Sequence, residues 1–379
     1  MTSNDSGATK NTGAGLRGQS AGQTGICTVG AEGNSLRYRG YDVVDLAQQS
    51  TFYETAFLIL KGHLPTQDEL DAWKEKLAGL RTLPEELKAV LELIPADAHP
   101  MDVMRTGCSF LGNIEPENDF SEQQDVADRL LAALPAIVIY WYRYSHDGVR
   151  VGQDTGEDGL GAHFLHMLLD RAPTELEARV MDVSLILYAE HEFNASTFAA
   201  RVCASTLSDL HSCITAAIGT LRGPLHGGAN EAAMEMIEQY GSVDDAVNDV
   251  LRKLKAKELI MGFGHAVYRL RDPRNAIIKG WSKQLAELKG DTVLYAVSEA
   301  VERTMKEEKN LFANADFFHA SAYHFMGIPT KLFTPIFVMS RVTGWAAHCF
   351  EQRANNRIIR PSADYTGPAA RDYTPIEER

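Results

Sequence analysis

The sequence has little cysteine, no long hydrophobic run and no excess of positive charge. Its five cysteines, among 379 residues, are scattered without a CxxC pair, which argues against a disulfide scaffold and favours a reduced, cytoplasmic setting. The longest uncharged apolar run, Leu130 to Tyr142, is too short to span a bilayer and contains Pro135. With 37 basic and 51 acidic residues the formal charge is −14, which argues against nucleic-acid and membrane-surface partners but allows a small anionic substrate.

The first two dozen residues are rich in Gly, Ser, Thr and Asn and contain no apolar block. This composition predicts a flexible N-terminal tail over residues 1–25 and gives no indication of a secretory signal. The remaining length allows two or three domains by the usual size of about 150 residues for each.

From Tyr41 onward the sequence reads almost entirely as helix. Three capping boxes, each followed by apolar residues at three- and four-residue spacing, start at Thr66, Ser121 and Thr174. Further helices are expected over 85–93, 100–111, 160–169, 195–221, 231–240, 243–255, 292–306 and 334–352. A small hairpin is expected between Ile26 and Tyr38, and no series of strands alternates with the helices, so the fold class is mainly α-helical.

The segment Ala195 to Leu221 is rich in Ala, Ser, Thr and Cys and nearly lacks charge. A surface helix would carry one charged face, so this pattern predicts a helix buried on all sides, in a large core or a subunit interface.

His226 stands in the stretch Gly-Pro-Leu-His-Gly-Gly-Ala-Asn, directly before an expected helix. The flanking glycines allow close approach of a ligand to the backbone. Asn230 is a good N-cap, so His226 is expected near the positive end of the helix dipole, where the imidazole stays neutral. A neutral histidine can polarise a carbonyl while a separate base removes the α-proton. A glycine-rich helix connection with an incidental histidine remains equally open on this stretch alone.

Two further polar clusters follow. Residues 262–268, Gly-Phe-Gly-His-Ala-Val-Tyr, lead into arginines that offer bidentate grips for carboxylate or phosphate. Asp316, in Asn-Ala-Asp, precedes an apolar aromatic helix start, where desolvation can raise a carboxylate pKa toward that of a useful base. The alternative for Asp316 is an N-cap, which the sequence alone favours.

A third histidine, His191, lies at an expected helix end in Ala-Glu-His-Glu-Phe-Asn-Ala-Ser. It is not part of a zinc HExxH motif, because position 195 is alanine, so no metal is expected. Arg341 lies on an apolar helix and needs a paired anion, unless it forms an internal salt bridge or an exposed turn. Arg357 and Arg360 are near the C-terminus, where arginines are usually solvated.

These motifs, in this order from about Ala21 to the end, resemble citrate synthases. Other stretches resemble the bacterial branch of that family that uses propionyl-CoA: residues 21–29, 38–42, 99–105, 140–146 and 358–363. The resemblance implies a helical homodimer and an acyltransferase that needs no cofactor, because the CoA thioester is itself a substrate. It also implies a large domain of residues 26–227 and 328–379, and a small domain of residues 228–327 that closes over the substrates.

The resemblance assigns catalysis to three residues. Asp316 would abstract the α-proton of the acyl-CoA, and His226 would donate a hydrogen bond to the thioester carbonyl. His265 would polarise and protonate the carbonyl of oxaloacetate as the carbon–carbon bond forms. Such an α-proton is weakly acidic, so base and electrophile must act together in a site that closure has dried.

The resemblance also assigns the binding residues. Those for the oxaloacetate carboxylates are His191, Arg274, Arg341 and Arg360, with Arg360 reaching the partner subunit's site. Those for CoA are Arg269 and the backbone of Met261, Gly262, Phe263 and Gly264. Acetyl-CoA is the alternative acyl donor, since one methyl is worth only about 1 to 3 kcal/mol of discrimination. A catalytically silent helical scaffold is a further alternative, against which the three intact catalytic residues argue.

Overall fold

The computed structural model describes residues 16, 18–31 and 34–379. The expected flexible tail therefore lies largely outside the described residues. The first part of the fold consists of the strands β1 (Cys27–Val29), β2 (Leu36–Tyr38) and β3 (Tyr41–Asp42), followed by α1 (Val43–Gln49), α2 (Phe52–Lys61), α3 (Gln67–Gly79), α4 (Glu85–Glu92), α5 (Pro100–Ile114), the 3₁₀ turn η2 (Phe120–Glu122), α6 (Gln123–Asp147) and α7 (Leu160–Leu169). The strands form one antiparallel sheet, which confirms the hairpin and adds β3 to it.

The second part carries the predicted site residues. Its elements are α8 (Glu175–Tyr188), α9 (Ala195–Ser205), α10 (Leu210–Leu221), α11 (Ala229–Ile237), α12 (Val243–Ala256), α13 (Pro273–Lys289), α14 (Thr292–Lys309), α15 (Ala315–Phe325), η3 (Thr330–Leu332), α16 (Phe333–Ala354) and η4 (Ile376–Glu378). The mainly α-helical fold class is confirmed, and α7 matches its expected range.

Two of the three predicted capping boxes are present at helix starts. Thr66 and Thr174 each form the predicted capping box, with the glutamate three residues later closing it. The box predicted at Ser121 is wrong: Asp119 accepts the Ser121 N–H and starts η2, and α6 begins only at Gln123. The Ser121 N–H, which the capping box would have paired with the side chain of Gln124, is instead bonded to Asp119 two residues earlier.

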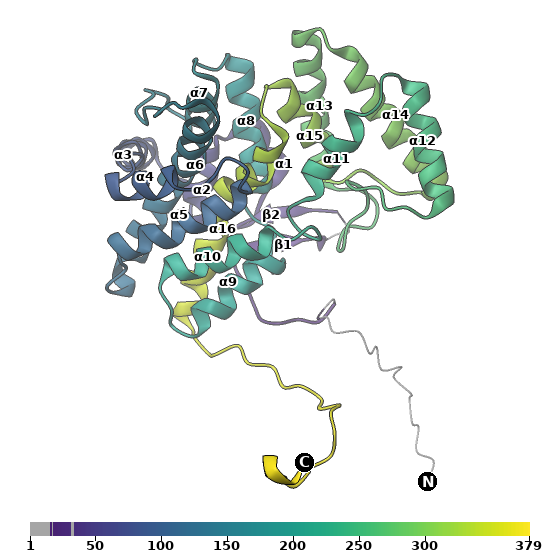
Figure 1. Cartoon of the computed structure of the whole chain (residues 1–379). Coiled ribbons are helices and arrows are strands. Elements are labelled where there is room, and N and C mark those ends of the chain that lie inside the picture. The colour runs from purple at the N-terminus through teal and green to yellow at the C-terminus, as the bar shows by residue number, and fades with distance from the viewer. Residues whose placement is uncertain (1–15, 17, 32–33) are drawn as a thin grey trace.

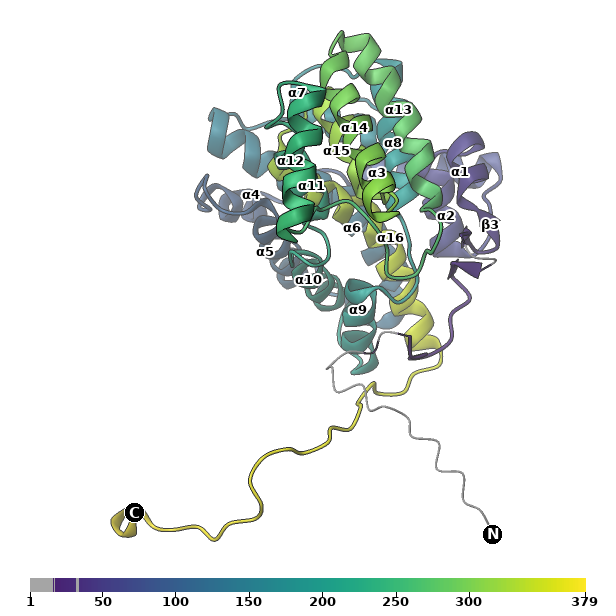
Figure 2. The ribbon, with the colours of Figure 1, turned by 90° about the vertical axis from the view of Figure 1, so that its right-hand side faces the viewer.

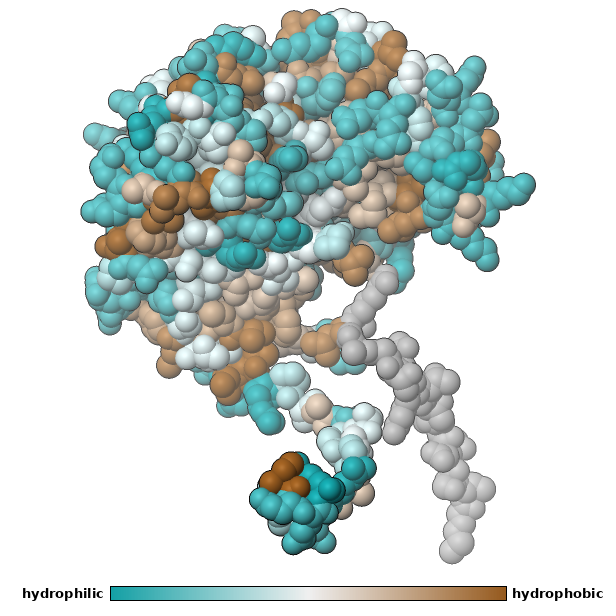
Figure 3. All heavy atoms as spheres, in the orientation of Figure 1, coloured by the Kyte–Doolittle hydropathy of each residue, from teal (hydrophilic) through white to brown (hydrophobic). Residues whose placement is uncertain are grey.

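The single helix predicted over residues 195–221 is wrong. The chain breaks between α9 and α10, where Leu207 adopts a left-handed conformation with φ 65° and Asp209 caps α10 by accepting the Ser212 N–H. Neither helix is buried on all sides within this chain, because Val202 on α9 and Thr215 on α10 are only half-buried. Apolar side chains gather on the surface over these two helices (Figure 3).

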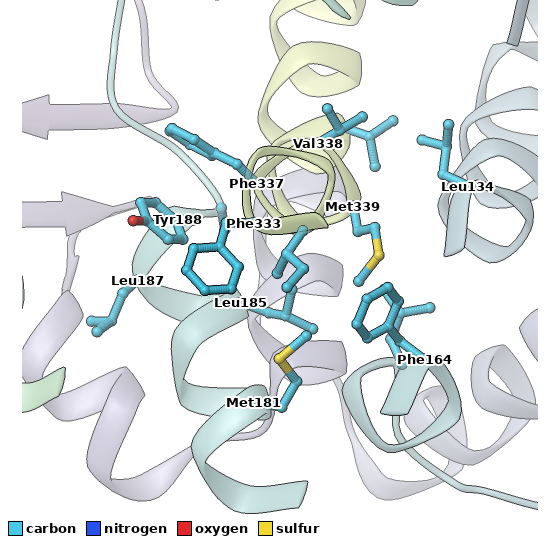
Figure 4. Close-up of a cluster of buried hydrophobic side chains, with 14 of the residues drawn as sticks. Leu134, Phe164, Met181, Leu185, Leu187, Tyr188, Phe333, Phe337, Val338 and Met339 are labelled. Atoms are coloured by element: carbon cyan, nitrogen blue, oxygen red, sulfur yellow. The ribbon is translucent and has the colours of Figure 1, made fainter. Parts of the chain in front are cut away.

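Helix α16 is the central element around which the others pack. Its side chains meet those of α6, α7 and α8 in one apolar cluster, in which Phe333 and Val338 are buried (Figure 4). The same helix carries Arg341, 1% exposed, so this packing also positions a candidate binding residue. Burial of about 25 cal/mol for each Å² of apolar surface makes such a cluster the main source of stability.

Gly344 sets how closely α16 approaches the end of α8. A Cβ at Gly344 would overlap Glu190 Oε2 and lie 2.6 Å from the carbonyl oxygen of Ala189. We expect Gly344→Ala to lower the free energy of unfolding by about 1–3 kcal/mol, since the backbone contact cannot yield without moving α16. Urea unfolding followed by circular dichroism measures this. The matched control is Gly280→Ala on α13, where a Cβ meets nothing within 4 Å, so helix propensity should stabilise the protein instead.

Helices α11 to α15 pack mainly on one another: they lie together on the right of Figure 1 and face the viewer in Figure 2. They contact the remainder through α13 against α8 and α1, and through α11 against α16. The domain boundaries near residues 228 and 327, and a closing movement between the two parts, stay predictions. Among the described residues, no helix is both long enough and apolar enough to cross a membrane.

Candidate active site

The three predicted catalytic residues and the predicted binding residue His191 come from separate segments that the fold brings to the junction of α8, α15 and α16. His191 follows the end of α8, His226 precedes α11, His265 lies between α12 and α13, and Asp316 is in the first turn of α15. Tyr188 and Phe337 connect these segments: their rings lie 4.3 Å apart, and Phe337 also contacts His226 and the guanidinium of Arg341.

The carboxylate of Asp316 is not used to cap helix α15, because Asn314 is the cap residue. Asn314 is the N-cap and accepts the Asp316 N–H at 3.0 Å, so the alternative that Asp316 is the cap is wrong. Tyr188 Oη donates to Asp316 Oδ1 at 2.6 Å. Burial raises the pKa of the Asp316 carboxyl above its ordinary value, while the Tyr188 hydrogen bond and the charge of Arg274 oppose that rise. The result is a carboxylate whose basicity is increased, as proton abstraction requires.

The contact between Tyr188 and Asp316 predicts a pH effect. Tyr188→Phe removes the hydrogen bond that lowers the pKa of Asp316, so that pKa rises further. A base must be ionised to act, so we expect the acid limb of the kcat/KM profile to move to higher pH, by roughly 0.5–1 unit. The profile of the variant beside that of the unaltered enzyme checks this. An unshifted limb would mean that the limb does not report Asp316.

His226 is neutral, but the predicted capping role of Asn230 is wrong. Asn230 does not cap the helix: Gly228 occupies the N-cap position, and Asn230 lies inside α11, where its amide donates to the Asp316 carbonyl oxygen at 2.8 Å. Burial, with the charge of Arg341 as a smaller cause, lowers the pKa of His226 to about 4. Desolvation therefore keeps the imidazole uncharged.

Ser196, at the start of α9, selects the tautomer of His226. The Ser196 backbone N–H lies 3.3 Å from His226 Nε2 and can only donate, so Nε2 accepts and Nδ1 carries the proton. Ser196 Oγ is 2.8 Å from the same nitrogen, and also 2.8 Å from Asn194 Oδ1, which already accepts the Thr197 N–H. Trp345 Nε1 donates to Ser196 Oγ at 3.1 Å and holds it in place.

His265 and His191 form a second pair with Tyr268 between them. Backbone N–H groups of Val267 and Tyr268 donate to His265 Nδ1 at 3.0 and 3.2 Å, so the proton of a neutral ring lies on Nε2. His191 Nε2 is 3.1 Å from Tyr268 Oη, and the centroids of the two histidine rings are 5.0 Å apart. Burial and the charge of Arg274 lower the pKa of His191 well below its ordinary value.

The glycine-rich loop before His265 is tied to the segment before Asp316. Gly262 and Gly264 have φ of 87° and 73°, the left-handed region that favours glycine. The Gly264 N–H donates to the Phe312 carbonyl at 2.8 Å, and Phe263 forms a β-bridge with Ala313. His265 and Asp316 are thus held on adjacent backbone segments. Met261 is half-buried at the start of this loop, and Arg269 is exposed just beyond it.

The predicted binding arginines differ in their partners. Arg274 is buried and forms an ion pair with Asp272, with nitrogen–oxygen distances of 2.9 and 2.8 Å. Arg341 Nε donates to the Tyr188 carbonyl at 2.6 Å. Among the described residues no carboxylate lies within 4 Å of its nitrogens, so the internal salt bridge considered for Arg341 is wrong, as is the exposed turn.

Arg360 and Arg357 are not brought to this site within one chain. Both are exposed in the segment beyond α16, which leaves the body of the molecule (Figure 1). Residues 357–359 instead border a cavity of about 1080 Å³, together with residues 21–25 and Arg201. None of the three predicted catalytic residues lines that cavity.

Three contacts of the predicted site residues were missed from the sequence: those made by Tyr188, Ser196 and Asp272. Tyr188 ends an apolar helix and gives no local sign of its hydrogen bond to a residue 128 positions away. Asp272 could have been found, since Asp-Pro at a helix start is a typical N-cap signal. Within the described part of the chain no group of three or more His, Cys, Asp or Glu side chains is arranged to hold a metal ion.

Comparisons with known proteins give a consistent result. The family model described as citrate synthase, C-terminal domain, matches residues 15–362. A 2-methylcitrate synthase from Shewanella oneidensis is 68% identical over 99% of this chain and 100% of its own length. Citrate synthase 2 from Bacillus subtilis is 43% identical over 91% of this chain and 94% of its own.

A solved structure is also similar over nearly the whole chain. It is citrate synthase from Thermoplasma acidophilum in a ternary complex with carboxymethyl coenzyme A and oxaloacetate. Its TM-score is 0.89 at 33% identity, covering 96% of this chain and 98% of that one.

Proposed function

The chain belongs to the citrate synthase family, and we propose that it is a 2-methylcitrate synthase. It condenses propionyl-CoA with oxaloacetate and water to give 2-methylcitrate and CoA, as in propionate catabolism, and also accepts acetyl-CoA. The 68% identity to the Shewanella oneidensis enzyme, against 43% to a citrate synthase, favours this function over citrate synthase of the tricarboxylic acid cycle. The observation that carries the reaction class is a carboxylate of raised pKa near two histidines with assigned donor nitrogens.

The first step is proton transfer from the acyl-CoA. Asp316 takes the α-proton, and His226 Nδ1–H donates a hydrogen bond to the thioester oxygen as negative charge moves onto it. Both groups are suited to this step. Burial raises the pKa of Asp316 and so strengthens it as a base, and burial keeps His226 a neutral imidazole, which donates a hydrogen bond while keeping its proton.

In the second step the enol carbon attacks the keto carbon of oxaloacetate. His265 Nε2–H polarises that carbonyl and supplies the proton to the new alkoxide. Water then cleaves the thioester, and the C–S bond breaks to release CoA as a thiol. Since hydrolysis of the thioester is strongly favourable, it drives the condensation forward.

The substrates are held by charge and by backbone. His191, Arg274 and Arg341 bind the carboxylates of oxaloacetate, and Arg360 reaches the same site in the partner of a homodimer. The ion pair of Arg274 with Asp272 fixes its guanidinium plane for bidentate binding. Residues 261–264 contact the adenine of CoA, Arg269 contacts its phosphate, and closure of residues 228–327 excludes water. The enzyme acts in the cytoplasm without a metal or cofactor.

The test is release of free CoA thiol from purified protein given oxaloacetate with either propionyl-CoA or acetyl-CoA. A larger kcat/KM for propionyl-CoA supports the proposal. A larger value for acetyl-CoA would assign the protein to the citrate-forming branch with the mechanism unchanged. No release with either thioester would contradict the enzyme and favour a silent scaffold.

A further inference from the structure

Arg341 is a buried cation without a bonded carboxylate among the described residues. Arg341 is 1% exposed; its Nε donates to the Tyr188 carbonyl, and its guanidinium carbon lies 4.7 Å from the centre of the Phe337 ring. Removing a guanidinium from water is costly unless negative charge compensates it. Before a substrate binds, that charge must come from the protein itself.

Glu190, next to His191, is the carboxylate placed to supply it. It is fully buried, and its Oε1 accepts a hydrogen bond from His348 Nε2 at 2.9 Å. Its Oε2 has no hydrogen-bond partner among the described residues. Burial lowers the pKa of Arg341 below its ordinary value, and the charge of Glu190 opposes this lowering.

The position of Glu190 depends on Gly344, one turn beyond Arg341 on α16. The carboxylate oxygen Oε2 occupies the space in which any other residue at 344 would place its Cβ. The face of α16 that carries Arg341, Gly344 and His348 is therefore built around Glu190.

Arg201, the other buried arginine beside His348, already has a carboxylate partner. Arg201 donates to His348 Nδ1 at 3.0 Å, but its ion pair at 2.7 Å is with Glu351, which also accepts the Gly25 N–H. His348 accepts at Nδ1 and donates at Nε2, as a neutral imidazole does. Neither Arg201 nor His348 therefore gives Glu190 a cationic partner, and Glu190 is the carboxylate whose charge acts on Arg341.

We propose that Glu190 is the internal counter-ion of Arg341 before substrate binds, a positioning residue that takes the place of a substrate carboxylate without bonding to the guanidinium. This inference rests on the proposed function, because it takes oxaloacetate as the ligand of Arg341. Arg274 shows the other arrangement: Asp272 bonds to its guanidinium and fixes it. Glu190 does not bond to Arg341, so the terminal nitrogens of Arg341 stay available to the ligand.

Two effects of opposite direction follow. Without the charge of Glu190 the ligand-free protein holds an uncompensated cation and becomes less stable. The same change removes a negative charge near the dianionic substrate, so oxaloacetate binds more tightly. A merely structural role for Glu190 would instead weaken binding, since a disordered site loses affinity.

The experiment compares Glu190→Gln with the unaltered full-length enzyme. Calorimetric titration with oxaloacetate alone gives Kd without turnover, and thermal unfolding with and without oxaloacetate gives Tm. We expect a lower Tm for the ligand-free variant and a Kd roughly 3- to 10-fold lower, as expected for one unit charge at several ångströms in a medium of intermediate polarity. An unchanged or higher Kd would overturn the proposal.

Asp128→Asn is the matched control. Asp128 is also a fully buried carboxylate, but it pairs with Lys76 at 2.6 Å, between α3 and α6. This variant should lose stability with no change in Kd, and a tightening as large as that of Glu190→Gln would overturn the proposal.

A second variant covers the case in which Glu190→Gln does not fold. Glu190→Asp keeps the charge but withdraws it by one methylene, so both effects should appear in the same directions at smaller size. Weaker oxaloacetate binding by this variant would overturn the proposal. If the unaltered enzyme itself bound no oxaloacetate, the proposed function would fail, and that result is distinct from either outcome for the variants.

Discussion

Replacing Asp316 with asparagine is expected to lower kcat roughly 10³-fold or more, while oxaloacetate still binds. Asparagine keeps the shape of the side chain and can accept the hydrogen bond from Tyr188, but its neutral amide takes no proton at any pH. Turnover with propionyl-CoA measures the loss. Exchange of the propionyl α-protons with deuterium from solvent, in the presence of oxaloacetate, should fall by a similar factor, because exchange reports proton abstraction directly.

The control for this variant is Asp182→Asn. Burial raises the pKa of Asp182 to about 6, so it too is a strongly perturbed carboxylate, but it accepts the Phe52 N–H at 3.0 Å and lies away from the histidines. Its replacement should cost stability and leave kcat within about twofold of the unaltered value, as expected for a residue outside the reacting groups. Full activity of Asp316→Asn would contradict the assignment of the base.

Much of the fold could be predicted because its signals are local. Capping threonines with a glutamate three residues later, such as Thr66 with Glu69, are complete within one turn of chain. The break between α9 and α10 could not be predicted in the same way. It has no glycine or proline, and it depends on Leu207 in a left-handed conformation. The N-cap Asp209, which accepts the Ser212 N–H, is a local signal there, but by itself it does not place a break inside an otherwise helical pattern.

The same division holds at the site. His226 and His265 are noticed in the sequence because glycines flank them. Their protonation states are not local: His226 is neutral because of burial and Arg341, rather than through a helix capped by Asn230. Tyr188 is at the end of α8 and Ser196 at the start of α9, and only the packing of the helices brings them to Asp316 and His226. Motifs therefore locate the candidate residues, whereas the fold determines their protonation states and contacts.

The second large effect is expected for His226→Ala, which should lower kcat roughly 10²- to 10³-fold by removing the hydrogen-bond donor to the developing enolate. Turnover with saturating substrates measures this. The control is His163→Ala on α7, outside the site: burial lowers the pKa of His163 to about 3, and its Nδ1 lies 2.9 Å from Thr155 Oγ1. This variant should lose stability but keep its rate, and an equal loss of rate would mean that the His226 result reflects folding.

The pH profile of His226→Ala then separates the roles of the two residues. Because burial lowers the pKa of His226 to about 4, the imidazole is already neutral well above that pH and contributes no limb near neutrality. The pKa of Asp316 is raised, so protonation of this base on acidification stops the reaction. The residual activity of His226→Ala should therefore keep the acid limb of the unaltered enzyme at nearly the same pH. A limb that vanished with the histidine would assign that titration to His226 and contradict a neutral electrophile.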